Sequence, residues 1–105
     1  MFNKSVVCRD GFTMSVQANY GAYCSPRDDL GPYVSVEVGY PTMVDQLLLP
    51  YAENNDEPTQ TVYGWVPVHK IVEIILSHGG MVAGELPTSP VFVSVDPKFG
   101  IKKNE

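Results

Sequence analysis

The sequence has few charged residues, few cysteines and no long hydrophobic run, and each shortage excludes a class of protein. Charged side chains make up 18% of the 105 residues, and the twelve acids outnumber the seven bases. Nucleic-acid binding requires clustered Lys and Arg, so we expect no direct nucleic-acid partner. Apolar runs such as Leu47 to Leu49 are far shorter than the roughly 20 residues of a spanning helix, so we expect no membrane partner.

The N-terminal residues and the cysteine content indicate a reducing compartment. The first ten residues contain no apolar segment of signal-peptide length, so we expect a soluble cytoplasmic protein. Cys8 and Cys24 are then reduced thiols, although their number alone leaves a disulfide between them open. The two cysteines and the two histidines, His69 and His78, lack the spacing of a zinc site. We therefore expect no metal and no cofactor.

Alternating apolar and polar residues predict strands in the first half of the chain. Asp10-Gly11 favours a two-residue type I′ turn, which would place Cys8 opposite Thr13. Residues 12–18 then alternate with the period of two that is typical of a half-buried strand, and residues 33–40 repeat the pattern. In this third strand of the chain the shared face would carry Val34, Val36, Val38 and Tyr40.

Two helices are predicted in the second half of the chain. Thr42 and Asp45 resemble a capping box, and they begin a helix of about two turns that Pro50 ends. A longer helix is predicted over 67–78, with Gly79-Gly80 as its C-terminal cap. Its apolar arc is wide and includes Val68, Ile71, Val72, Ile74, Ile75 and Leu76. Such an arc is typical of a well-buried helix.

The remaining segments complete one small α+β domain over residues 1–97. β-branched and aromatic residues predict a strand over 61–66, and alternating valines predict a last strand over 91–95. The predicted order is β-β-β-α-β-α-β, with a small antiparallel or mixed sheet and the main helix (about 67–78) on one face. Residues 98–105 form a polar tail that we expect to be mobile.

The segment 19–32 is the candidate binding region, because it is long for a loop in so small a domain. Aromatic side chains and arginine supply most of the strong contacts at binding surfaces. The candidate binding residues are Tyr20, Tyr23, Cys24, Arg27, Tyr33 and Trp65. The alternative is structural: the tyrosines would cover the edge of the sheet, and Arg27 would pair with Asp28 or Asp29.

Nothing in the sequence indicates catalysis. Nucleophilic chemistry at Cys24 would require a lowered thiol pKa and a base within hydrogen-bond reach. Surface placement and helix capping account for His69 and His78, and no phosphate-binding glycine loop or nucleophile elbow is present. We therefore expect a protein that is not an enzyme.

Four blocks carry a resemblance to small bacteriophage and prophage proteins that form no named family. The blocks are residues 14–18, 23–27, 36–40 and 62–67, and the resemblance spans roughly residues 6–80. It implies an accessory or counter-defence inhibitor that binds a host protein in the bacterial cytoplasm. Two alternatives stay open. One is a small-ligand protein, either a monomer or a homodimer, that binds or sequesters a nucleotide signal. The other is a minor virion component.

Overall fold

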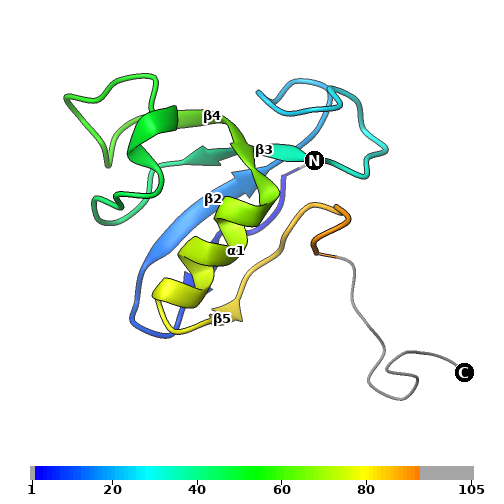
Figure 1. Cartoon of the computed structure of the whole chain (residues 1–105). Helices are drawn as coiled ribbons and strands as arrows, with labels where there is room; N and C mark the ends of the chain where they lie inside the picture. The colour runs from blue at the N-terminus through cyan, green and yellow to red at the C-terminus, as the bar shows by residue number, and fades with distance from the viewer. Residues whose placement is uncertain (1, 93–105) are drawn as a thin grey trace, which may run out of the picture.

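Figure 1 shows the computed structural model of the chain, which describes residues 2–92. A five-stranded antiparallel sheet has the strand order β4-β3-β2-β1-β5, and helix α1 lies across one of its faces. The strands are β1 (Val6–Cys8), β2 (Thr13–Gln17), β3 (Ser35–Gly39), β4 (Val62–Pro67) and β5 (Met81–Ala83). The helices are α1 (Val68–Ser77) and a short 3-10 helix, η1 (Leu49–Tyr51). The predicted α+β class, with one main helix on a sheet, is confirmed.

The hydrophobic core lies between the sheet and α1. Met14 and Val16 of β2 and Val36 and Val38 of β3 are fully buried, as their alternation predicts. The helix contributes Val68, Ile71, Ile74 and Ile75 to the same core. The apolar arc of α1 was predicted too wide, because Leu76 is 69% exposed. Its side chain belongs to the outer face of the helix.

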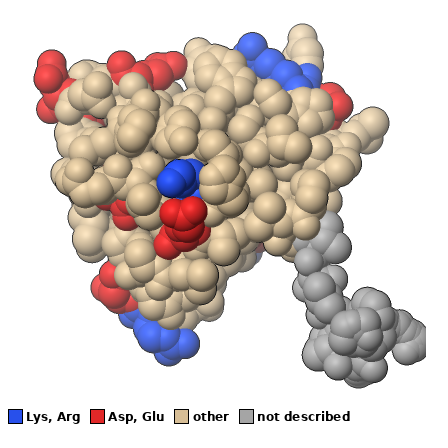
Figure 2. All heavy atoms as spheres, viewed as in Figure 1, with Lys and Arg blue, Asp and Glu red and all other residues tan. Residues whose placement is uncertain are grey.

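The outer side of α1 carries little charge. Figure 2 shows this side of the molecule as a mostly uncharged surface, with adjacent basic and acidic groups near its middle and other charged groups toward its edges. On the helix itself, the ammonium group of Lys70 lies 3.6 Å from the carboxylate of Glu73. An exposed pair of this kind contributes little to stability, so burial of the inner face is what holds α1 in place.

The turn between β1 and β2 is one residue longer than predicted. The Gly11 N–H donates to the Cys8 carbonyl at 3.0 Å, and the Cys8 N–H donates to the Phe12 carbonyl at 2.8 Å. Gly11 has φ +95°, the left-handed conformation that ends a three-residue hairpin loop. Val6 therefore pairs with Met14. Cys8 joins the core, whereas the predicted register would have placed it beside Thr13 on the other face of the sheet.

The predicted two-turn helix after Thr42 is wrong, because its capping residues have other partners. The Thr42 hydroxyl accepts a hydrogen bond from the Thr13 N–H at 2.9 Å, which ties this segment to β2. The carboxylate of Asp45 accepts from the Leu47 N–H at 2.9 Å and forms a tight local turn. Only η1 follows, with Pro50 in its first turn.

Strand boundaries also differ from the predictions. β3 is shorter than 33–40, and Val34 and Tyr40 at its ends are 59% and 60% exposed. β5 was missed, since its three residues carry no alternation; it pairs with β1 at the edge of the sheet. Residues 91 and 92 of the predicted last strand lie in a turn, and its other residues and the tail 98–105 lie outside the described residues.

Candidate functional site

Tyr23 and Trp65 form an aromatic stack at the outer edge of β4. Their ring centroids are 5.1 Å apart with an interplanar angle of 20°. The guanidinium carbon of Arg27 lies 5.5 Å from the centroid of the Tyr23 ring. Trp65 is 50% exposed and Arg27 is also exposed, so the stack reaches solvent. We call these three side chains the stacked surface.

A bulge in β4 places Trp65 in this position. On β3, Val38 pairs with Tyr63 and Val36 pairs with Val66, so two residues of β4 lie opposite the single residue Glu37. The second of them, Trp65, has φ +50°, a conformation that is rare for a bulky side chain. The bulge therefore turns the indole out of the core while its neighbours Tyr63 and Val66 stay fully buried.

Backbone hydrogen bonds fix Tyr23 against the strand. Its N–H donates to the carboxylate of Glu37 at 2.8 Å, and its carbonyl accepts from the Trp65 N–H at 2.9 Å. Glu37 alternates with the buried residues Val36 and Val38, so the stack lies on the side of the sheet opposite α1. Gly64 permits this close approach, because a Cβ there would lie 3.3 Å from the Tyr23 Cβ.

Arg27 lacks the ion pair that the structural alternative requires. Within residues 2–92 its guanidinium lies within 4.0 Å of no carboxylate. Asp28 accepts from the N–H groups of Leu30 and Gly31, each at 3.0 Å, and Asp29 accepts from the Tyr20 N–H at 2.8 Å. Both neighbouring carboxylates thus shape the loop, and the charge of Arg27 is available to a partner.

The six candidate residues do not form one surface. The structure brings Tyr23, Arg27 and Trp65 together, whereas the side chain of Tyr20 is 74% exposed and takes no part in the stack. Tyr33 and Cys24 are buried, at 4% and 1% exposed, which corrects their assignment to a binding surface. The Tyr33 hydroxyl donates to the Asp28 carbonyl at 2.8 Å, so this side chain supports the loop from within.

The environment of Cys24 opposes nucleophilic chemistry. Burial raises the pKa of its thiol, which disfavours the thiolate. The S–H group donates toward the carbonyl oxygens of Asn19 and Pro26, at 3.3 and 3.4 Å. Cys8 and Cys24 are both free thiols. Among residues 2–92, no group of three or more His, Cys, Asp or Glu side chains is arranged to hold a metal ion.

A second polar cluster was not predicted at all. The imidazole of His78 contacts the carboxylates of Asp10 and Asp45, which lie 68 and 33 residues away in the sequence. The two carboxylates meet opposite ring nitrogens and so do not converge on a single point. No motif of neighbouring residues predicts a contact between residues so far apart in the sequence. The one signal in the sequence is that the acidic side chains could pair with a protonated histidine.

Comparisons with protein-family models, with curated proteins and with solved structures give no match. In the described part of the chain, no helix combines the length and hydropathy that a membrane span requires. Function must therefore be argued from the geometry of the sites themselves.

Proposed function

We propose that this protein is a non-enzymatic interaction protein that binds another protein through the stacked surface. The resemblance to phage proteins suggests the partner and the purpose: a host protein in the bacterial cytoplasm, bound by a phage accessory or counter-defence inhibitor. The observation that carries the proposal is the solvent-facing stack of Trp65 on Tyr23, with the Arg27 guanidinium over the Tyr23 ring. A bulge that holds Trp65 in a left-handed conformation, which costs free energy, places the indole in this stack.

The chemistry of the stacked surface suits protein recognition. Trp, Tyr and Arg are the residue types most enriched among the strong contacts of interfaces. Here the backbone hydrogen bonds of Tyr23 hold the aromatic rings in place before a partner arrives, so little side-chain entropy is lost on binding. The planar guanidinium of Arg27 stacks on Tyr23 and can form a two-pronged contact with a carboxylate of the partner.

A capture experiment with matched variants tests the proposal. The purified chain would be immobilised and exposed to bacterial lysate, alongside Trp65→Ala, Arg27→Ala and Tyr40→Ala. Tyr40 is the control, because it is an exposed aromatic residue with φ +51° that lies outside the stack. We expect wild type and Tyr40→Ala to retain the same protein in a fixed ratio, and Trp65→Ala and Arg27→Ala to lose it.

Equal retention by all four chains would contradict the proposal. The nucleotide-binding alternative has a separate outcome, since stacking and arginine also suit a base and a phosphate. In that case heat denaturation of the purified chain would release a nucleotide, and added nucleotides would raise its melting temperature. A minor virion component would instead be found in purified phage particles.

A further inference from the structure

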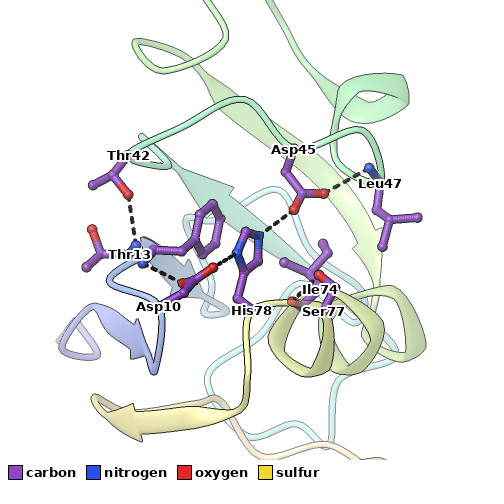
Figure 3. A network of polar contacts seen from close by, with 9 residues as sticks. Asp10, Thr13, Thr42, Asp45, Leu47, Ile74, Ser77 and His78 are labelled. Carbon is purple, nitrogen blue, oxygen red and sulfur yellow. Dashed lines mark hydrogen bonds and ion pairs between the residues drawn. The ribbon is translucent and has the colours of Figure 1, made fainter.

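Three segments that are distant in the sequence meet at the C-terminal end of α1. Figure 3 shows the ring of His78 between Asp10, from the β1–β2 turn, and Asp45, from the segment before η1. The Nδ1 atom of His78 lies 2.7 Å from Asp10 Oδ2, and its Nε2 atom lies 2.8 Å from Asp45 Oδ2. One ring therefore contacts two loops at the end of the helix.

Backbone N–H groups orient both carboxylates toward the ring. Asp10 Oδ1 accepts from the Phe12 N–H at 2.9 Å, and Asp45 Oδ1 accepts from the Leu47 N–H at 2.9 Å. The second oxygen of each carboxylate is thereby aimed at His78. The ring of Phe12 covers the imidazole, with centroids 3.9 Å apart and an interplanar angle of 6°. The contact is thus built from several fixed groups and does not depend on two mobile side chains.

This geometry determines the charge of the ring. A neutral imidazole has one N–H and one lone pair, so it can donate to only one of two ionised carboxylates. The other carboxylate would then face a lone pair at close range, which is repulsive. Both contacts are favourable only when both ring nitrogens carry protons. The side chains of His78 and Asp45 are 12% and 8% exposed, so water screens the interaction weakly.

We propose that Asp10, His78 and Asp45 form a proton-held clasp, which fastens the segment 43–47 to the end of α1 and loosens when His78 loses a proton. Burial acts to lower the pKa of His78, but hydrogen bonds to both carboxylates outweigh it, so this pKa is raised. The hydrogen bond from His78 is the main cause that lowers the pKa of Asp10. The clasp is therefore closed below the ordinary pKa of histidine and opens as the pH rises through the raised pKa of His78.

Other titratable groups near the clasp do not supply the same switch. Burial raises the pKa of the Cys8 thiol and of the Tyr63 hydroxyl, so both stay neutral while His78 titrates. The guanidinium of Arg9 is exposed and donates to the Gly79 carbonyl at 3.2 Å. Among residues 2–92, the charged groups that shift the pKa of His78 are Asp10 and Asp45.

Opening the clasp would expose apolar surface. Phe12 and Leu48 are fully buried, one beneath His78 and one just after Asp45. Release of the segment 43–47 would uncover the adjacent side chain of Leu48 while the strands stay paired, which is a local opening of the kind that amide exchange detects. The clasp would thus couple the pH to the exposure of a new apolar surface far in sequence from the stacked surface.

Histidine NMR and amide exchange on the full chain test this inference. We expect the titration midpoint of His78 to lie above that of the same residue in the urea-unfolded chain. We also expect exchange of the Leu47 amide, measured relative to Val38 in β3, to accelerate as His78 titrates. A midpoint at or below the unfolded value, or a constant ratio of the two exchange rates, would overturn the clasp.

A conservative variant separates the clasp from general stability. In Asp10→Asn the amide can still accept from the Phe12 N–H and can donate to a neutral imidazole. Asp10 is 45% exposed at its side chain, so the variant should fold. We expect the midpoint of His78 to fall in Asp10→Asn and to stay unchanged in the control His69→Gln, which alters the other, exposed histidine. An unchanged midpoint in Asp10→Asn would also contradict the proposal.

Discussion

Substitution of Trp65 by glycine and by alanine separates binding from stability at the centre of the stacked surface. Both changes remove the indole and its contact with Tyr23. They differ in the backbone, because Trp65 has φ +50°, which glycine adopts without strain and alanine does not. The two variants should therefore lose the same binding contacts and have different stabilities.

The magnitudes follow from the backbone conformation. A left-handed conformation costs a residue with a Cβ about 1–2 kcal/mol, and glycine returns about 0.5–1 kcal/mol of this as extra entropy in the unfolded chain. Trp65→Gly should therefore be about 0.5–1 kcal/mol more stable than Trp65→Ala, the reverse of the usual order. Loss of a strong interface contact should cost both variants about 2 kcal/mol of binding free energy, roughly 30-fold in Kd.

Urea denaturation and calorimetric titration with the captured partner measure the two quantities on the same proteins. Equal Kd values for the two variants, despite their different stabilities, would assign the loss of binding to the indole itself. A Trp65→Ala chain more stable than Trp65→Gly would refute the left-handed conformation. Binding that falls in proportion to stability would refute a direct contact.

Three further predictions concern the fold. Ile71→Ala should lower the free energy of unfolding by about 2–5 kcal/mol in urea denaturation, because this side chain is fully buried; an unchanged midpoint would mean that α1 does not face the core. Gly84→Ala should cost about 2 kcal/mol or more, since its Cβ would lie 2.2 Å from a backbone oxygen at φ +109°. Gly80→Ala, at φ +98° with open space around it, is the matched control and should cost only about 1–2 kcal/mol. In thermal melts, stability should be greatest between about pH 4 and 6.5. The stabilisation from protonated His78 is lost as the pH rises through its raised pKa, and the stabilisation from ionised Asp10 is lost as the pH falls through its lowered pKa. A melting temperature that still rises above this pH window would contradict the raised pKa of His78.

The elements that could be predicted are those whose burial leaves a local pattern. A strand with one buried face shows a period of two, so the core positions of β2 and β3 follow from the sequence. The register of the first hairpin does not, because Asp10-Gly11 suits a two-residue loop and also the three-residue loop that forms. The false helix after Thr42 has a different cause. Thr42 is bound to Thr13 and Asp45 contacts His78, and no window of local sequence contains these partners.

The candidate site could be predicted in its residue types but not in its assembly. Tyr23 and Arg27 stand out as an aromatic residue and a cation in a long loop, and Trp65 stands out as the single tryptophan. Their meeting depends on a bulge that only the pairing of β3 with β4 reveals. Composition also could not separate them from Tyr33 and Cys24, which the same loop turns inward.

Fluorine NMR of a single fluorotryptophan tests the central claim most directly. The chain has one tryptophan, so replacement by fluorotryptophan gives one resonance that reports on Trp65 alone, whatever aromatic residues the partner contains. On titration with the captured partner, we predict that this resonance shifts and saturates at the binding stoichiometry. We also predict that the solvent-induced shift between light and heavy water is lost as the exposed indole is covered. Saturated binding with an unmoved resonance would contradict the assignment of the stacked surface as the binding site.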